Sequence, residues 1–284
     1  MKALFIFSFA FGLSLAAGDA INIGTRRELF VHDALIESVS GEARLELHHP
    51  EAREIALEHS AAWEGSGSGY HSVFRDGDLY RMYYKAWHLE VSDGKVTTDR
   101  HPLFCCYAES PDGIRWSKPA LGLYDFQGSA ENNIVMVSGV QGPLNVDAGH
   151  PAVFRDENPA AAEDARYKAI LRSEKPGGLL PFKSPDGIHW TPMTDAPILS
   201  GLGAFDSQNL AFWDPVREQY REYHRGFKAG VRDIMTSTSD DFSHFGEPQW
   251  LAYTGVDPEH LYTCLLYTSP SPRDRTRSRM PSSA

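Results

Sequence analysis

The sequence of 284 residues is 42% hydrophobic and 12% aromatic, which is enough to bury a sizeable core in one large domain or two smaller ones. Its aromatic residues, 24 glycines and 18 prolines favour short strands joined by tight turns over helical bundles. The formal net charge of −11 argues against nucleic acid and anionic membranes as partners.

The first twenty residues have the features of a secretory signal peptide. Lys2 provides a short positive region, residues 3–15 form an apolar run too short to span a bilayer, and small residues within 16–20 offer cleavage sites. No Cys follows this run, as it would in a lipoprotein. We therefore expect a secreted or periplasmic protein. Further on, short apolar segments at 29–31 and 35–36 predict a strand that closes a ring of sheets or covers its edge.

A turn motif recurs along the chain and carries much of the fold prediction. It reads SPDGIRW at 110–116 and SPDGIHW at 184–190, with a degenerate copy, SDDFSHF, at 239–245. In each copy we expect a strand to end at the Ser, the Asp to form a tight turn, and the aromatic residue to return to the core.

A second unit precedes each turn motif. It consists of an apolar strand, an acidic turn and an aromatic-rich strand, and its copies are residues 70–84, 150–171 and 209–224. Together the two units give the strand order of a four-stranded blade, and repeats of this length are typical of propellers. We predict an all-β propeller with blades at about 63–123, 145–199 and 204–251 and the start of a fourth at 259. Propellers have about 4–8 blades, so this is an open arc.

Residues 264–284 are rich in Ser, Pro and Arg and have no hydrophobic period. The first eleven, CLLYTSPSPRD, can be back-translated into a sequence that resembles a transposon adaptor of sequencing libraries. We expect this tail to be non-native and disordered, and the natural gene to continue beyond Thr263. The tail holds four Arg and one Asp, so the rest of the chain carries a formal net charge of −14. Only Cys105 and Cys106 then remain, a poor disulfide because neighbours in a strand face opposite ways.

One carboxylate precedes each predicted innermost strand: Glu64, Asp147, Asp206 and Glu259. In a propeller these strands line the central channel, so the four are expected at its mouth. A glycosidase needs one carboxyl there as general acid and another as nucleophile or base, and desolvation would set their pKa values apart. Each carboxylate could instead form a turn. Asp206 is favoured because Gln208 and Asn209 follow it, and amides hydrogen-bond sugar hydroxyls.

Tyr70, His71, His150 and Arg232 complete the candidate substrate contacts. The histidines lack the spacing of a zinc site, and His71 and His150 stand at matching places, so substrate contact or channel lining is preferred to metal binding. Tyr70 is suited to the core of a blade or to stacking on a sugar. Arg232 is suited to an ion pair between blades or to a clamp on a ligand. No cofactor or catalytic metal is expected, with a structural calcium ion in the channel left open.

The hairpin motifs and the leading carboxylates resemble those of the five-bladed propeller glycosidases of families 32, 43 and 62. More specifically, residues 205–215 (FDSQNLAFWDP), 230–235 (GVRDIM) and 258–263 (PEHLYT) resemble bacterial secreted proteins similar to the glycosyl hydrolase family 32 N-terminal domain. The resemblance covers about residues 27–263. It implies a five-bladed β-propeller, truncated here after about three blades, that acts on oligo- or polysaccharides with Asp206, Asp147 and either Glu259 or Glu64 in the site.

The sequence also departs from these families. The invertase motif WMNDPN is absent, with WEGSG at 63–67 in its region, and complete RDP and EC motifs are missing. Fold therefore transfers more safely than activity. Two functions of different class follow: a secreted glycoside hydrolase, and a non-catalytic carbohydrate-binding or scaffold propeller. A sialidase-like hydrolase is a third alternative, although its Asp-box has one more residue between Asp and Gly.

Overall fold

The computed structural model describes residues 22, 36–44, 46, 49–98, 101–201, 203–252 and 259–261. The chain divides into two compact units, residues 1–48 and 49–284. All of the regular secondary structure described below belongs to the second. The predicted signal peptide and tail, and most of the predicted closing strand at 29–36, lie outside the described residues.

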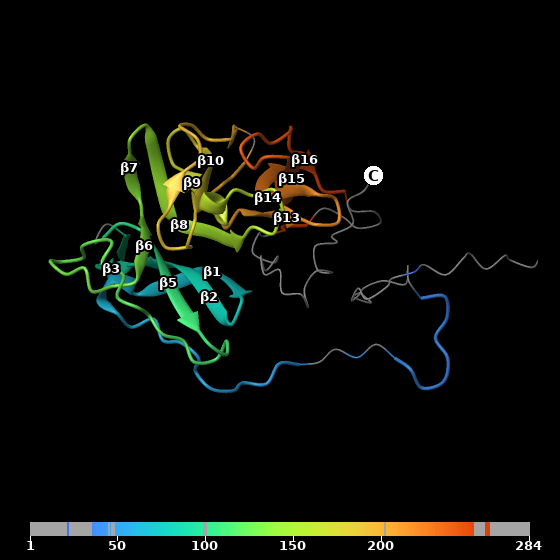
Figure 1. Ribbon diagram of the computed structural model, residues 1–284, viewed down its shortest axis with the longest axis horizontal. Helices are drawn as coiled ribbons and strands as arrows, with labels where there is room; N and C mark the ends of the chain where they lie inside the picture. The colour runs from blue at the N-terminus through green and yellow to red at the C-terminus, as the bar shows by residue number, and fades with distance from the viewer. Residues whose placement is uncertain are drawn as a thin grey trace, which may run out of the picture. The chain divides into compact units, whose positions relative to one another are not determined.

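The second unit is all-β (Figure 1), and its described residues include two single-turn 3₁₀ helices, η2 (Ala62–Glu64) and η3 (Glu163–Ala165), and no α-helix. Three antiparallel sheets follow one another in chain order. Sheet 1 contains β1 (Gly67–Asp76), β2 (Leu79–Trp87), β5 (Phe104–Ser110) and β6 (Ile134–Val137). Sheet 2 is built on β8 (Leu144–Arg155), β9 (Tyr167–Ser173) and β10 (Gly178–Ser184), with the short strands β7 (Gly139–Gln141), β11 (Thr191–Pro192) and β12 (Leu199–Ser200) beside them. Sheet 3 contains β13 (Leu210–Asp214), β14 (Gln219–Lys228), β15 (Val231–Ser239) and β16 (Gln249–Trp250). A separate hairpin joins β3 (Glu90–Ser92) to β4 (Lys95–Thr97).

The three turn motifs form as the sequence predicted. β5, β10 and β15 each end at the Ser of the motif. The Asp that follows accepts two backbone N–H bonds of the turn through Oδ1, at 2.8–2.9 Å in all three copies. In the first copy the N–H groups of Arg115 and Ile114 hold the pKa of Asp112 at about 2. The closing aromatic residues Trp116, Trp190 and Phe245 pack against the core.

The fourth strand of sheet 1 lies at Ile134–Val137, outside the residues predicted for the first blade. Ser117 exchanges backbone hydrogen bonds with Glu109, as the first residue of a returning strand would. The next hydrogen-bonding position in that ladder is Pro119, which has no N–H. The chain therefore leaves the sheet, and the N–H of Tyr107 bonds to the carbonyl of Asn133 at 2.9 Å instead.

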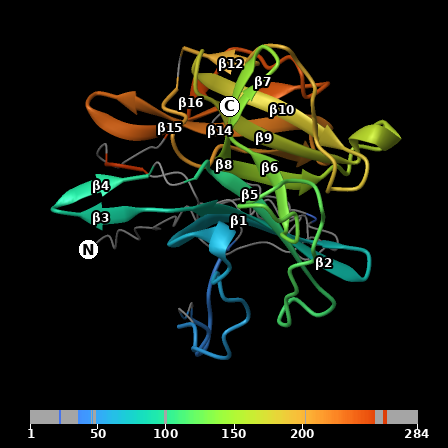
Figure 2. The ribbon, with the colours of Figure 1, turned by 90° about the vertical axis from the view of Figure 1, so that its left-hand side faces the viewer.

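The cores of the sheets are continuous with one another. Tyr83, Val153 and Phe182 belong to one cluster that joins sheets 1 and 2, while Phe154 and Tyr220 belong to a cluster that joins sheets 2 and 3. Strands of sheet 2 contact strands of both sheet 1 and sheet 3, and Figure 2 shows the strands of sheet 1 below those of sheet 2. The adjacent cysteines are free, and they face two different clusters, as neighbouring strand residues should.

Polar ties join sheets 1 and 2 at the ends of their first strands. Asp76, the last residue of β1, accepts a hydrogen bond from Arg81 of β2 at 2.8 Å and forms an ion pair with Arg155 of β8 at 3.2 Å, and the Tyr167 hydroxyl of β9 donates to the same carboxylate. The backbone N–H of Val153 also donates to the Ser72 hydroxyl at 3.2 Å. β1 and β8 therefore run side by side in the same direction.

Sheets 2 and 3 are tied in the same way. Asp156 follows β8 directly, and its buried carboxylate forms an ion pair with Lys168 of β9. It also accepts a hydrogen bond from the Tyr220 hydroxyl, at the start of β14, at 2.6 Å. Since β14 starts where β13 ends, β13 runs in the direction of β8. The N-terminal ends of β1, β8 and β13, called their leading ends below, therefore all lie at the opposite end of the sheets from these ties, which mark the far ends.

A turn of sheet 2 docks on sheet 1 through one glycine. The Tyr83 hydroxyl donates to the carbonyl of Gly187 at 2.9 Å, and Arg81 donates to the neighbouring carbonyl of Asp186 at 2.8 Å. Gly187 has φ +81°, and a Cβ there would lie 2.5 Å from the Tyr83 hydroxyl oxygen. In the matching turn of sheet 1, Gly113 has φ +77°, but a Cβ would meet only the Tyr80 ring at an ordinary 3.5 Å.

We expect Gly187→Ala to lower the free energy of unfolding by about 1–3 kcal/mol more than Gly113→Ala, because an unsatisfied buried hydroxyl and carbonyl cost about that much. Both variants place an alanine in a left-handed backbone conformation and lose stability for that reason, but only Gly187→Ala also displaces Tyr83. Urea denaturation of the two variants measures the difference. Equal losses would show that the turn does not hold the sheets together.

Candidate functional site

The leading ends of β1 and β8 meet the segment before β13, and four residues proposed from the sequence lie together there: Tyr70, Asp147, His150 and Gln208. The rings of Tyr70 and His150 are 5.2 Å apart between centroids. The Gln208 amide nitrogen donates to the carbonyl of Tyr70 at 3.2 Å and to that of Pro151 at 3.0 Å. This contact brings all three sheets to one place.

The backbone at Tyr70 is held in an unusual conformation. Its φ is +53°, and the register of β1 against β2 shifts between Gly69 and Ser72. A left-handed aromatic residue costs about 1–3 kcal/mol, and bulges of this kind re-aim a side chain. The left-handed backbone at this bulge therefore sets the direction of the Tyr70 ring.

Asp147 is fully buried and has three partners. Its carboxylate accepts the N–H of Gly149 at 2.8 Å, is bonded to His150 Nδ1 at 2.7 Å, and lies 3.1 Å from Arg172 Nη1. Burial alone would raise its pKa, but the hydrogen bond to His150, the Gly149 amide and the Arg172 charge outweigh it and lower the pKa. Asp147 therefore stays ionised and fixes His150 and Arg172.

Asp206 forms the opposite arrangement. Its carboxylate is paired with Arg225 of β14, but the carboxylate side chain is 60% exposed and the guanidinium side chain only 4% exposed. The carbonyl of Arg225 also accepts the N–H of Ala204 at 2.7 Å, which anchors the segment that carries Asp206. This carboxylate can reach a bound molecule.

Glu64 is enclosed rather than exposed. It accepts hydrogen bonds from the Tyr84 hydroxyl at 2.6 Å, from Lys118 Nζ at 2.7 Å and from the Ala61 N–H at 2.8 Å, and it lies 3.4 Å from His59. Burial acts to raise its pKa, yet these partners lower it to about 2. In this arrangement Glu64 joins η2 to β2 and has no exposed surface.

His71 lies beside this group and apart from His150. Its Nε2 is 3.1 Å from Nε2 of His59, and its ring stacks on Tyr84 at 5.7 Å. Burial, and then the neighbouring His59, lower the pKa of His71 to about 4. The two histidines that the sequence placed at matching positions thus have different surroundings.

The other predicted residues are held by backbone contacts. The buried Asn209 donates to the carbonyls of Phe205 at 3.0 Å and Ser207 at 2.9 Å, which shapes the segment before β13. Glu259 is exposed, and the residues after it bond to the backbone of Arg232 at 3.0–3.1 Å. Glu259 therefore lies beside the start of β15.

The structure adds a pattern of three cations, two of which, Lys85 and Arg172, were not singled out from the sequence. Each second strand carries a Lys or Arg five residues after a Tyr, in residues 80–85, 167–172 and 220–225. These cations are Lys85, Arg172 and Arg225, and the last two pair with Asp147 and Asp206. Aligning the aromatic-rich strands would have shown the pattern.

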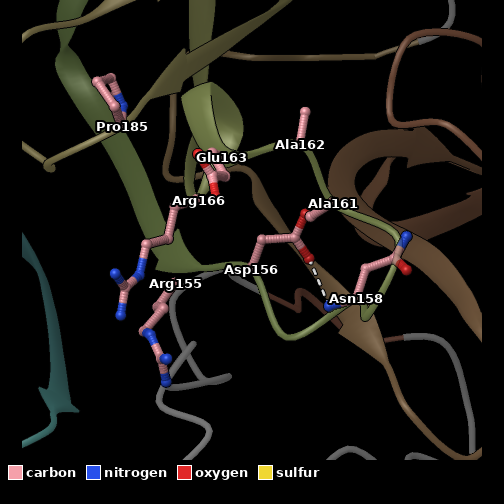
Figure 3. A pocket seen from close by; sticks show the side chains of 8 residues that line it. All are labelled: Arg155, Asp156, Asn158, Ala161, Ala162, Glu163, Arg166 and Pro185. Atoms are coloured by element: carbon pink, nitrogen blue, oxygen red, sulfur yellow. Dashed lines mark hydrogen bonds between the residues drawn. The ribbon is translucent and has the colours of Figure 1, made fainter.

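A hollow of about 510 Å³ lies at the far end of β8, away from this site (Figure 3). The guanidinium groups of Arg155 and Arg166 lie on one side of it, and Asn158 lies on the other, bonded through its N–H to Asp156 at 2.9 Å. The Asp156 carboxylate is already committed to Lys168 and Tyr220. Asp156 therefore offers no free carboxylate to a molecule bound in the hollow.

In the part of the chain that the structure describes, no three His, Cys, Asp or Glu side chains gather as they would around a metal ion. No helix there is long and apolar enough to cross a membrane.

No protein-family model matches the chain, and a search of curated proteins finds no match. Among solved structures, the chain is similar to a family 117 glycoside hydrolase from Zobellia galactanivorans, with 11% identity and a TM-score of 0.43 over 69% of this chain and 58% of that one. It is similar to a β-1,2-mannobiose phosphorylase from Listeria innocua, with 12% identity and a TM-score of 0.43 over 66% and 60%. It is also similar to a fructofuranosidase from Schwanniomyces occidentalis, with 14% identity and a TM-score of 0.40 over 67% and 36%.

The chain thus spans 36% to 60% of the length of these three structures. TM-scores below 0.5 carry no argument about activity. The function proposed below rests on the residues of the site.

Neutral His71 makes stability depend on pH. Its folded pKa of about 4 lies below the ordinary 6.5, so the unfolded chain binds more protons between these values. The contribution of neutral His71 to the free energy of unfolding is fully present above pH 6.5 and is lost as the pH falls toward 4. Allowing for partial exposure of the ring, we expect the free energy of unfolding to fall by about 1–2 kcal/mol between pH 7 and pH 5 from this group.

Urea denaturation at the two pH values checks this, with His71→Gln expected to remove that part of the fall. The exposed His49→Gln is the control and should behave like the unmodified chain. An unchanged pH dependence in His71→Gln would contradict the assignment.

Proposed function

We propose that this chain is part of a secreted five-bladed β-propeller, and that it binds oligo- or polysaccharides at the leading ends of its first strands and hydrolyses their glycosidic bonds. The observation that carries the proposal is the contact of groups from three sheets beside one exposed carboxylate. Three successive antiparallel sheets with strands in chain order, and the sequence resemblance to family 32, support the propeller.

The contacts suit a sugar. The Tyr70 ring offers an apolar face with a polar edge, the combination that stacks on a pyranose or furanose ring. His150 uses Nδ1 for Asp147, which leaves Nε2 for a sugar hydroxyl. Gln208 holds the Tyr70 carbonyl and so fixes the ring relative to sheet 3.

Asp206 is the reactive carboxylate in this proposal. Its pairing with the buried Arg225 holds the carboxylate in place, and its exposure lets it attack an anomeric carbon or activate water. Asp147 and Glu64 are unsuited to be the general acid, because both have lowered pKa values and both are buried. Among the four candidates, exposed Glu259 is assigned that role.

We expect Asp206→Asn to reduce hydrolysis by roughly 10²–10⁴-fold, the usual contribution of such a group. Reducing ends released from a panel of plant and algal oligosaccharides measure it. The exposed Asp195→Asn is the matched control and should keep full activity. Activity that survives in Asp206→Asn would remove this residue from catalysis.

A non-catalytic carbohydrate-binding propeller is the second candidate. The observation that favours it is that two of the four carboxylates are fully buried and ion-paired. Binding of an oligosaccharide by the unmodified chain with no release of reducing ends, and equal binding by Asp206→Asn, would establish it in place of the hydrolase.

A further inference from the structure

Two cation–carboxylate pairs at the site present opposite charges to solvent. In the pair of Arg225 and Asp206, the carboxylate is the exposed member. In the pair of Arg172 and Asp147, the carboxylate side chain is 0% exposed and the guanidinium side chain 29% exposed. A molecule that arrives beside Tyr70 and His150 therefore meets the cation of the second pair and never its carboxylate.

A second cation lies in the same place. Lys85 of β2 stands opposite Gly69 of β1, and its ammonium is 5.5 Å from the centroid of the Tyr70 ring and 4.8 Å from that of Trp87. Its side chain has no hydrogen bond or ion pair within the part of the chain that the structure describes. The two aromatic faces hold the ammonium in position without neutralising it.

The charges of this group do not balance. Lys85 lies close enough to Asp147 and Arg172 for both to act on its pKa. Burial lowers that pKa, Asp147 raises it, and the like charge of Arg172 lowers it again. One buried carboxylate thus serves two cations that both keep contact with solvent.

At the far ends of the strands, each cation is in direct contact with a carboxylate. Arg81 and Arg155 share the carboxylate of Asp76, which also accepts the Tyr167 hydroxyl, and Lys168 has Asp156. Those cations bond directly to carboxylates that tie the sheets. The ammonium of Lys85 makes no such contact with a described residue, so it is available to a ligand.

We propose that Lys85 and Arg172 together bind an anionic group, a carboxylate or a sulfate ester, carried by the sugar that stacks on Tyr70. This inference rests on the proposed function and narrows its substrates to acidic carbohydrates. Arg172 supplies a planar fork with donors left after its bond to Asp147, and Lys85 supplies a compact charge beside it. Asp147 keeps Arg172 in place without facing the ligand.

The test measures binding of paired oligosaccharides to the 284-residue chain by calorimetry. Each uronic acid oligosaccharide is paired with its methyl ester, and each sulfated oligosaccharide with its desulfated counterpart. The two sets distinguish a carboxylate from a sulfate as the anion. Inorganic phosphate is included as a free anion without a sugar.

We expect at least one acidic oligosaccharide to bind roughly tenfold or more tightly than its uncharged counterpart, the ratio that a charge-assisted hydrogen bond gives. In Lys85→Met, which keeps the length of the side chain, this ratio should shrink to less than about twofold. The exposed Lys95→Met on β4 is the control and should preserve it. Circular dichroism of each variant confirms that the sheets are intact.

Equal binding of acidic and uncharged counterparts, or a ratio unchanged in Lys85→Met, would overturn the inference and leave the proposed function standing. Binding of phosphate with no preference for any acidic sugar would also overturn it. Binding of no carbohydrate at all would overturn both.

Discussion

The carboxylates at the far ends of β1 and β8 are the constraint on which the arrangement of the sheets depends. Each is bonded to a cation of the next strand, and each also accepts a hydrogen bond from a tyrosine hydroxyl of the next sheet. A buried carboxylate left without its cation costs several kcal/mol, so these ties have few tolerated alternatives. They hold the first strands of successive sheets parallel to one another. The leading ends of these strands are thereby brought together, although among the described residues no ion pair joins the sheets there.

The same pairing of carboxylate and cation serves a different purpose at the leading ends. At the far ends both members are at least partly buried and the bond is structural. At the leading ends one member of each pair remains exposed, the carboxylate of Asp206 and the guanidinium of Arg172. Each pair thus neutralises its buried member and leaves the other member in contact with solvent.

Much of the fold could be predicted from the sequence, because the turn motifs are local. Ser110 and Asp112 bond to N–H groups two or three residues away, so four or five letters specify the turn. The fourth strand of sheet 1 was misplaced because Pro119 removes a single N–H. The surroundings of Glu64 could not be foreseen, since Lys118 reaches it from 54 residues away. By contrast, the pattern of a cation on each second strand was readable from the repeat, but Lys85 and Arg172 were not singled out from it.

The amide of Gln208 makes the site chemically fragile in one respect. Its nitrogen donates to carbonyls of β1 and β8, so a single NH₂ group holds two sheets to the segment before a third. Hydrolysis of that amide to a carboxylate, the ordinary ageing reaction of glutamine, exchanges two donors for an oxygen that can only accept. Two attractions then become two repulsions against carbonyl oxygens, with no change in the size of the side chain. One slow reaction at a single side chain would therefore weaken the contact that brings the three sheets together at the site.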